Sequence, residues 1–130
     1  KRQVIYKASY DMATGEFNDV KLLAGSFGVT GYADGTGTSA KFNEPSQGDV
    51  DEDGNFYVAD RGNHCIRVIT PDGEVSTYAG QNKAGMVDGI ASLAEFNNPE
   101  GCQFGPDGAL YVADYSNHAI RKVEDGPAQP

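Results

Sequence analysis

Two histidines hold positions in this chain from which metal chemistry could be built. His64 and His118 each follow an aspartate by four residues, where a run of strand-forming residues resumes. A neutral imidazole at the end of a strand is a good zinc ligand. A catalytic zinc site also needs further ligands that converge on one point, and the spacing does not identify them. We therefore expect both histidines to be structural, packed between repeated units, and keep a metal site as the alternative.

A second group of polar residues could hold a cation or contact a ligand. It precedes two prolines and comprises Asn43, Glu44, Asn97 and Asn98. The chain has 19 acidic and 10 basic residues, and its net charge of −9 favours a cation over an anion. The same balance argues against nucleic acid or an anionic membrane as partner, because both need a positive surface. No apolar run is long enough for membrane insertion.

The segment 49–60 imitates the calcium-binding loop of an EF-hand, because acidic residues stand at positions 49, 51, 53 and 60. An EF-hand requires flanking helices, whereas the residues on both sides have strand character. We interpret the segment as a strand, a tight turn and a second strand.

These residues fall on a repeat of 54 residues. The segment 56–67 (FYVADRGNHCIR) recurs as 110–121 (LYVADYSNHAIR), and the pattern A-x-F-N-x-P upstream of it recurs as well. Such a period predicts supersecondary units that bury their faces against each other. Arg61 and Tyr115 occupy the same loop position in the two copies, among unchanged neighbours. Because arginine and tyrosine are common interface anchors, we predict that they contact a ligand. The alternative is that both are solvent-exposed side chains without a binding role.

The pattern of turn residues predicts an all-β structure. Gly, Asp, Asn and Pro recur at short intervals, with β-branched and aromatic runs between them. The expected strands cover residues 4–10, 17–23, 46–50, 56–59, 65–70, 75–78, 101–104, 110–113 and 119–123. Four short antiparallel strands joined by tight turns describe one blade of a β-propeller.

The antiparallel order decides which loops share a face. The turns at 60–64 and 114–118 fall on the same side as the long loops 24–45 and 79–99. Loops on a rigid scaffold are where binding usually resides, so this face is the functional candidate.

The repeat also suggests roles inside the scaffold. Arg67 and Arg121 recur on a strand, and we expect each to pair with acids between blades. Cys65 and Cys102 stand at non-equivalent repeat positions without metal-binding spacing, and we expect two buried small hydrophobes.

The recurring motif Y-V-A-D-x-x-N-H-x-I-R, together with A-x-F-N-x-P before it, resembles the NHL repeat in its long-loop form. The resemblance implies a propeller, commonly of six blades. Six blades of this period need about 320 residues, within the range of four to eight blades known for propellers. The chain would then be a fragment of a six-bladed propeller, with about two and a quarter blades. Residues 1–24 would form the last two strands of a preceding blade, and residues 25–79 a first complete blade. Residues 80–126 would form a second blade without its outermost strand, followed by a tail at 127–130. The rest of the propeller would come from the parent chain or from self-assembly, a threefold ring being one arrangement.

The resemblance also implies a function. NHL propellers commonly present one loop-rich face to a protein, peptide or glycan, and we predict such an interaction module with no catalytic residue and no cofactor. The alternative is a metal-dependent lyase or hydrolase with zinc or calcium at the propeller axis. In related amidating-lyase propellers a histidine at a similar position binds zinc, and in gluconolactonase-like propellers Glu, Asn and Asp near the axis hold a divalent metal.

Overall fold

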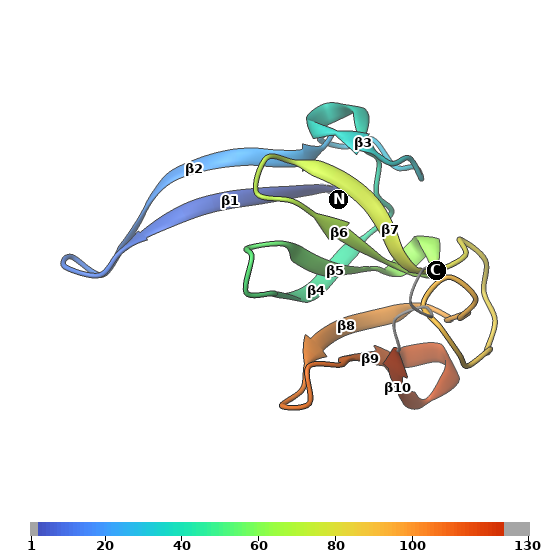
Figure 1. Ribbon diagram of the computed structural model, residues 1–130. Coiled ribbons are helices and arrows are strands. Elements are labelled where there is room, and N and C mark those ends of the chain that lie inside the picture. Colours follow the sequence, from blue (N-terminus) through green and yellow to red (C-terminus); the bar gives the residue numbers. More distant parts are fainter. Residues whose placement is uncertain (1–2, 124–130) are drawn as a thin grey trace, which may run out of the picture.

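The computed structural model describes residues 3–123 as an all-β arrangement of ten strands in three antiparallel sheets (Figure 1). The helices of this range are single 3-10 turns. None of the described residues therefore belongs to a helix long and apolar enough to cross a membrane.

Every strand expected from the sequence is present, with boundaries that differ by at most two residues. The strands are β1 (Val4–Asp11), β2 (Glu16–Gly25), β3 (Gly35–Thr36), β4 (Pro45–Val50), β5 (Phe56–Asp60), β6 (Cys65–Ile69), β7 (Glu74–Gly80), β8 (Pro99–Phe104), β9 (Leu110–Asp114) and β10 (Ala119–Val123). The 3-10 turns are η1 (Gly37–Ser39), η2 (Arg61–Asn63) and η3 (Tyr115–Asn117). Of the strands, β3 alone was not expected.

The central sheet is a four-stranded blade with β3 added at its outer edge, in the order β3-β7-β6-β5-β4. Gly35 pairs with Val75 and Thr36 with Glu74. The expectation of an unbroken loop over residues 24–45 was therefore wrong at this point. A pair of residues with no apolar alternation carries no strand signal, and β3 forms because the loop runs along the free edge of β7.

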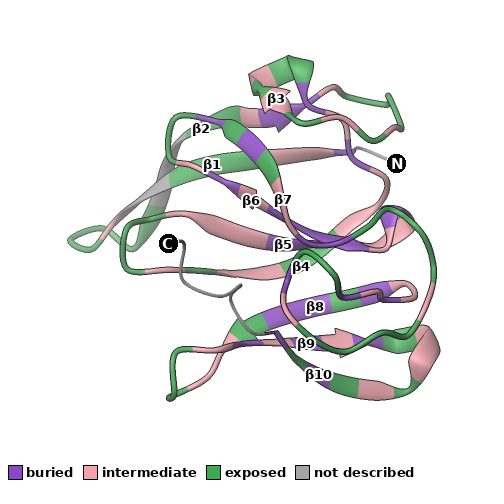
Figure 2. Ribbon diagram, turned by 45° about the vertical axis from the view of Figure 1, so that its right-hand side comes forward, coloured by how far each residue is buried: buried purple, intermediate pink, exposed green. Residues whose placement is uncertain are grey.

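Three sheets stack face to face in chain order, as Figure 1 shows. Between the central blade and the sheet β8–β10 lies one apolar core, to which Ala59 and Ile66 contribute from one side and Leu110 and Val112 from the other. Burial follows this interface along β5, β6 and β8 (Figure 2). The hairpin β1–β2 packs on the other side of the central blade through a second core. This is the stacking of successive propeller blades, so the predicted fold class is confirmed. The blade limits at residues 24 and 79 stay predictions. The predicted limit at 126 and the tail 127–130 lie outside the described residues.

A buried arginine in each blade fastens the long loop to the sheet. Arg67, which is fully buried, donates from Nη1 to Asp60 Oδ2 at 2.7 Å and to the carbonyl of Lys41 at 2.9 Å. Its Nη2 donates to Asp34 Oδ1 at 2.9 Å and to the carbonyl of Ala33 at 2.8 Å.

Arg121 makes the equivalent set of bonds in the second blade. Its Nη1 lies 2.7 Å from Asp114 Oδ2 and its Nη2 lies 2.8 Å from Asp88 Oδ1. The prediction that these arginines pair with acids between blades was therefore wrong. Each long loop folds back over its own blade, and it brings the acid and the carbonyl groups of the same repeat to the guanidinium.

The two cysteines lie in the core, as expected, and neither forms a disulfide. Burial raises the pKa of each thiol to about 12. Because the thiolate is the reactive form of cysteine, Cys65 and Cys102 act as apolar packing groups in the folded chain.

Candidate functional site

The turns η2 and η3 and the loop between β7 and β8 gather at one edge of the stacked sheets, on the right in Figure 1. The turn η1 lies apart from them, since the N–H of Gly37 donates to the carbonyl of Gly73 in the turn between β6 and β7. The backbone N–H of Gly62 in η2 donates to the carbonyl of Asn43 at 2.8 Å, and that of Ser116 in η3 donates to the carbonyl of Asn97 at 3.0 Å. The prediction that the short turns share a face with the long loops is therefore confirmed. We call this surface the loop face.

A buried aspartate positions the asparagine in each blade. Asp60 Oδ1 accepts the N–H of Asn43 at 2.8 Å, while its Oδ2 accepts from the side chain of Asn63 at 2.8 Å. Asp114 repeats the first of these bonds with Asn97 at 2.8 Å. Burial raises the pKa of Asp60, and the hydrogen bonds from Asn43, Asn63 and Arg67 oppose that rise. The backbones of the predicted residues Asn43 and Asn97 thus belong to the scaffold of the loop face.

Arg61 and Tyr115, predicted as ligand contacts, lie against each other across the junction between the two blades. The Arg61 guanidinium stands over the Tyr115 ring, 5.6 Å from its centroid. Its Nη2 also lies 3.8 Å from the carboxylate of Glu100 at the start of β8. The Arg61 and Glu100 side chains are 39% and 47% exposed, and Tyr115 is 55% exposed. We call this trio of arginine, tyrosine and glutamate the junction site.

Glu100 was not predicted as a site residue, and it stands where the first repeat has Ser46. Its exposure and charge alone do not distinguish it from other surface acids. The signal available was its place one residue after the proline that begins an innermost strand, next to the junction.

His64 joins the two blades. Its Nδ1 accepts the backbone N–H of Asn98 at 3.0 Å. The preceding junction has the same contact, in which the Gln3 side chain accepts the N–H of Glu44. Gln3, His64 and the residues that they bind all have φ between +54° and +59°. The expected packing of His64 between blades is confirmed, and Gln3 was missed because it lies outside the repeated motif.

Removing the His64 imidazole should weaken the junction, because the N–H of Asn98 loses its acceptor. We expect His64→Ala to lower the free energy of unfolding by about 1 kcal/mol, the usual net value of one hydrogen bond. His118, the repeat counterpart, is exposed, so His118→Ala should change it by less than about 0.5 kcal/mol. Urea unfolding of both variants measures the difference. Equal losses would show that the bond to Asn98 contributes nothing.

Within residues 3–123, no group of three or more His, Cys, Asp and Glu side chains is arranged to hold a metal ion. The EF-hand-like segment folds as β4, a turn and β5. Asp51 closes that turn, because its Oδ1 accepts the N–H groups of Asp53 and Asn55 at 2.9 Å. The interpretation of this segment as a strand turn is confirmed.

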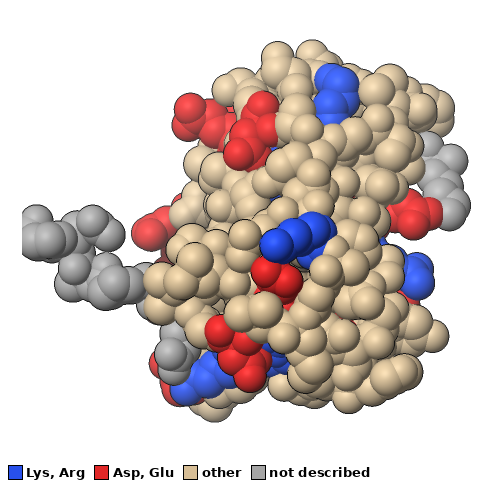
Figure 3. All heavy atoms as spheres, turned by 90° about the vertical axis from the view of Figure 1, so that its right-hand side faces the viewer, with Lys and Arg blue, Asp and Glu red and all other residues tan. Residues whose placement is uncertain are grey.

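The loop face carries scattered charges on a mostly uncharged surface. Figure 3 shows it with acidic and basic side chains interspersed and no continuous basic area in this view. Such a surface lacks the positive stripe that tracks a nucleic-acid backbone.

Family comparison agrees with the repeat seen in the sequence. The NHL repeat profile matches residues 42–69 and 96–123, one match in each blade. The chain is an NHL-repeat protein. NHL repeat-containing protein 2 of Bos taurus is 33% identical to it over 105 residues, which are 80% of this chain and 14% of that protein.

Two solved structures resemble the NHL chain in fold. An auxiliary nutrient binding protein from Bacteroides thetaiotaomicron VPI-5482 superposes with a TM-score of 0.85 at 30% identity, over 95% of this chain and 33% of that one. An auxiliary nutrient binding protein from Bacteroides ovatus ATCC 8483 also gives a TM-score of 0.85, at 33% identity, over 97% of this chain and 33% of that one. The NHL chain thus spans one third of each of these two structures and a smaller share of the bovine protein.

Proposed function

We propose that the chain is a binding module and that its loop face holds a protein or peptide ligand at the junction site. The observation that carries the proposal is the contact of Arg61 with Tyr115, at equivalent positions of successive blades and 5.6 Å from guanidinium to ring centroid. Both side chains stay partly exposed, so each keeps surface for a partner.

The junction site is ordered before any ligand arrives. Each of η2 and η3 is tied to a long loop by a backbone hydrogen bond, and the carboxylate of Glu100 lies 3.8 Å from the far end of the Arg61 side chain. Ordering a long side chain on binding costs about 0.5–1.5 kcal/mol, and this arrangement lowers that cost. Arginine and tyrosine are also the residues that most often dominate the energy of an interface.

The solved structures support a binding role in general terms, because two similar proteins carry the name nutrient binding protein. A nutrient can be a glycan, so a glycan is the other ligand class to test at the same site. One further similar structure, from Bacteroides thetaiotaomicron VPI-5482, carries the name Putative phosphatase. A phosphatase is a hydrolase, so the hydrolase alternative has support of the same general kind.

Selection from a random peptide library displayed on phage supplies a probe without knowledge of the natural partner. For the enriched peptides, we expect Arg61→Ala and Tyr115→Ala each to raise the Kd at least about tenfold, which corresponds to about 1.4 kcal/mol. Biolayer interferometry with the immobilised chain measures this.

Lys83→Ala is the matched control, since it removes an exposed cation from the loop between β7 and β8 of the same face. It should leave the Kd unchanged. Peptides that bind the Arg61→Ala chain as tightly as the wild type would refute the junction site. A glycan array probed with the same variants decides between the ligand classes: glycan binding that depends on Arg61 would replace the peptide as ligand.

A further inference from the structure

The Arg61 guanidinium has hydrogen-bonding capacity that the chain does not use. Within residues 3–123 none of its nitrogens makes a hydrogen bond, and its Nε is buried without a partner. The Glu100 carboxylate lies 3.8 Å from Nη2, which is longer than a hydrogen bond between a guanidinium and a carboxylate. A guanidinium carries five N–H donors, so those on Nη1 and Nη2 remain for a group from outside the chain.

Other cations of the two blades are engaged more closely. Arg67 and Arg121 each place Nη1 and Nη2 on carbonyl and carboxylate oxygens of their own blade, at 2.7–3.1 Å. In the long loops, Lys41 donates to a backbone carbonyl at 2.8 Å, and Lys83 Nζ lies 3.3 Å from a carboxylate. Arg61 differs from these side chains, because its ion pair is 3.8 Å long and comes without a hydrogen bond.

The contact with Tyr115 positions the guanidinium and leaves its donors unoccupied. The ring lies 5.6 Å from the guanidinium carbon, measured to the ring centroid, and it attracts the cation through its charge rather than through the N–H groups. The Arg61 side chain remains 39% exposed. A carboxylate matches such an edge well, because its two oxygens accept two parallel hydrogen bonds from one guanidinium.

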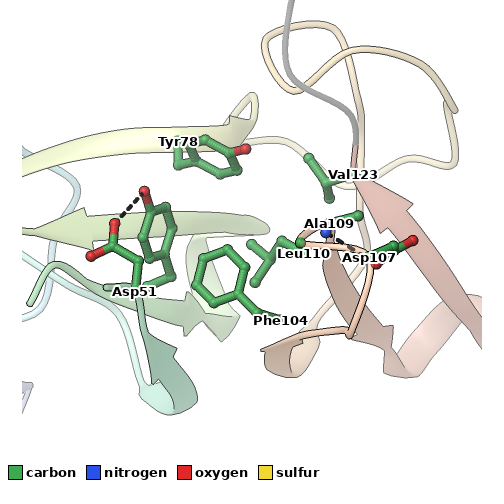
Figure 4. A pocket seen from close by; sticks show the side chains of 9 residues that line it. Asp51, Tyr78, Phe104, Asp107, Ala109, Leu110 and Val123 are labelled. Atoms are coloured by element: carbon green, nitrogen blue, oxygen red, sulfur yellow. Dashed lines mark hydrogen bonds between the residues drawn. The ribbon is translucent and has the colours of Figure 1, made fainter. Parts of the chain in front are cut away.

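The opposite edge of the sheets is acidic, unlike the loop face around Arg61. A cavity of about 540 Å³ lies there, near the turns that join β4 to β5 and β8 to β9. Figure 4 shows Asp51 and Asp107 on opposite sides of the space, and each carboxylate accepts hydrogen bonds within its own turn. Asp107 also lies 3.5 Å from Lys122 Nζ. An acidic ligand group would therefore meet carboxylates at this edge, and unused N–H donors on the loop face.

We propose that the junction site binds a carboxylate of its peptide ligand on Nη1 and Nη2 of Arg61. This inference rests on the function proposed above and names the chemistry of the ligand. The carboxylate comes from an Asp or Glu side chain or from the peptide's C-terminus. The exposed pair with Glu100 contributes little, so Arg61 can turn to the ligand. A phosphate fits less well, since its charge of about −1.5 to −2 would stand beside Glu100 in a chain of net charge −9.

Peptides enriched in the phage selection are the probe. Each is synthesised with a free or an amidated C-terminus, and with its Asp and Glu residues replaced one at a time by Asn and Gln. By biolayer interferometry, we expect one of these changes to raise the Kd for the wild-type chain at least about tenfold. The same change should leave the Kd of the Arg61→Gln chain nearly constant, because the partner is already lost. The sensitive position shows which carboxylate is bound.

Lys83→Gln is the matched control chain, because it removes a positive charge from the same face and leaves Arg61 in place. The difference between acid and amide peptides should persist in it, which separates a direct contact from general charge attraction. Circular dichroism checks that both variants fold. Peptides that need Arg61 but bind equally well as acids and amides would overturn this inference and leave the junction site standing, as would an acid preference that persists in the Arg61→Gln chain. A selection without any peptide that needs Arg61 would overturn both.

Discussion

Replacing Asp60 by alanine should lower the free energy of unfolding by about 3–5 kcal/mol, the usual loss when one partner of a buried ion pair is removed. Asp60 and Arg67 are both fully buried, and their atoms lie 2.7 Å apart. The substitution leaves the guanidinium without its buried counter-charge, and it also removes the acceptor for Asn43 and Asn63. Such a loss is a large part of the stability of an ordinary domain.

Guanidinium chloride unfolding followed by circular dichroism measures the effect. Asp34→Ala is the matched control, because Asp34 binds the same arginine at 2.9 Å from a side chain that is 51% exposed. It should cost about 1 kcal/mol or less, the usual range for an exposed ion pair. Equal losses in the two variants would contradict the role given to Asp60 as the buried anchor of the long loop.

Phe96→Ala should have an effect of similar size, about 3–5 kcal/mol, as is usual when a buried aromatic ring is truncated. The ring is fully buried in the core between the two blades. It also lies under the guanidinium of Arg121, 5.3 Å from its centroid. Removing it takes packing from both blades and from the arginine that fastens the second loop.

Thermal unfolding of Phe96→Ala can be compared with that of Phe27→Ala, whose ring is 67% exposed. The control should change stability by less than about 0.5 kcal/mol. A small loss for Phe96→Ala would mean that the blades are held by the other residues of the core, and that the long loop contributes little to their contact.

The strands were predictable because their signal is local. Alternating and β-branched residues between Gly, Asp and Pro fix the position of β5 in the first copy, and β9 repeats it in the second. Gly35 and Thr36 of β3 could not be found in this way, since their pairing with β7 depends on the path of a loop in space.

Two of the three residues of the junction site were singled out from the sequence, without their arrangement. The repeat identified Arg61 and Tyr115 as variable residues at one loop position, but their contact arises from the stacking of two blades. Glu100 had only its place after Pro99 to mark it, and Gln3 lies outside the repeated motif. Arg67 was assigned to the wrong acids because the sequence does not show that the long loop folds over its own blade.

The most direct test of the proposed function is to locate the bound ligand on the chain. A peptide enriched from the phage library would be titrated into the ¹⁵N-labelled chain while the backbone amide shifts are recorded. The account predicts that the largest changes fall on residues 61–64 and 115–118, on the loop face. Largest changes in the turns 51–55 and 105–109 at the opposite edge, with the loop-face amides unmoved, would contradict it.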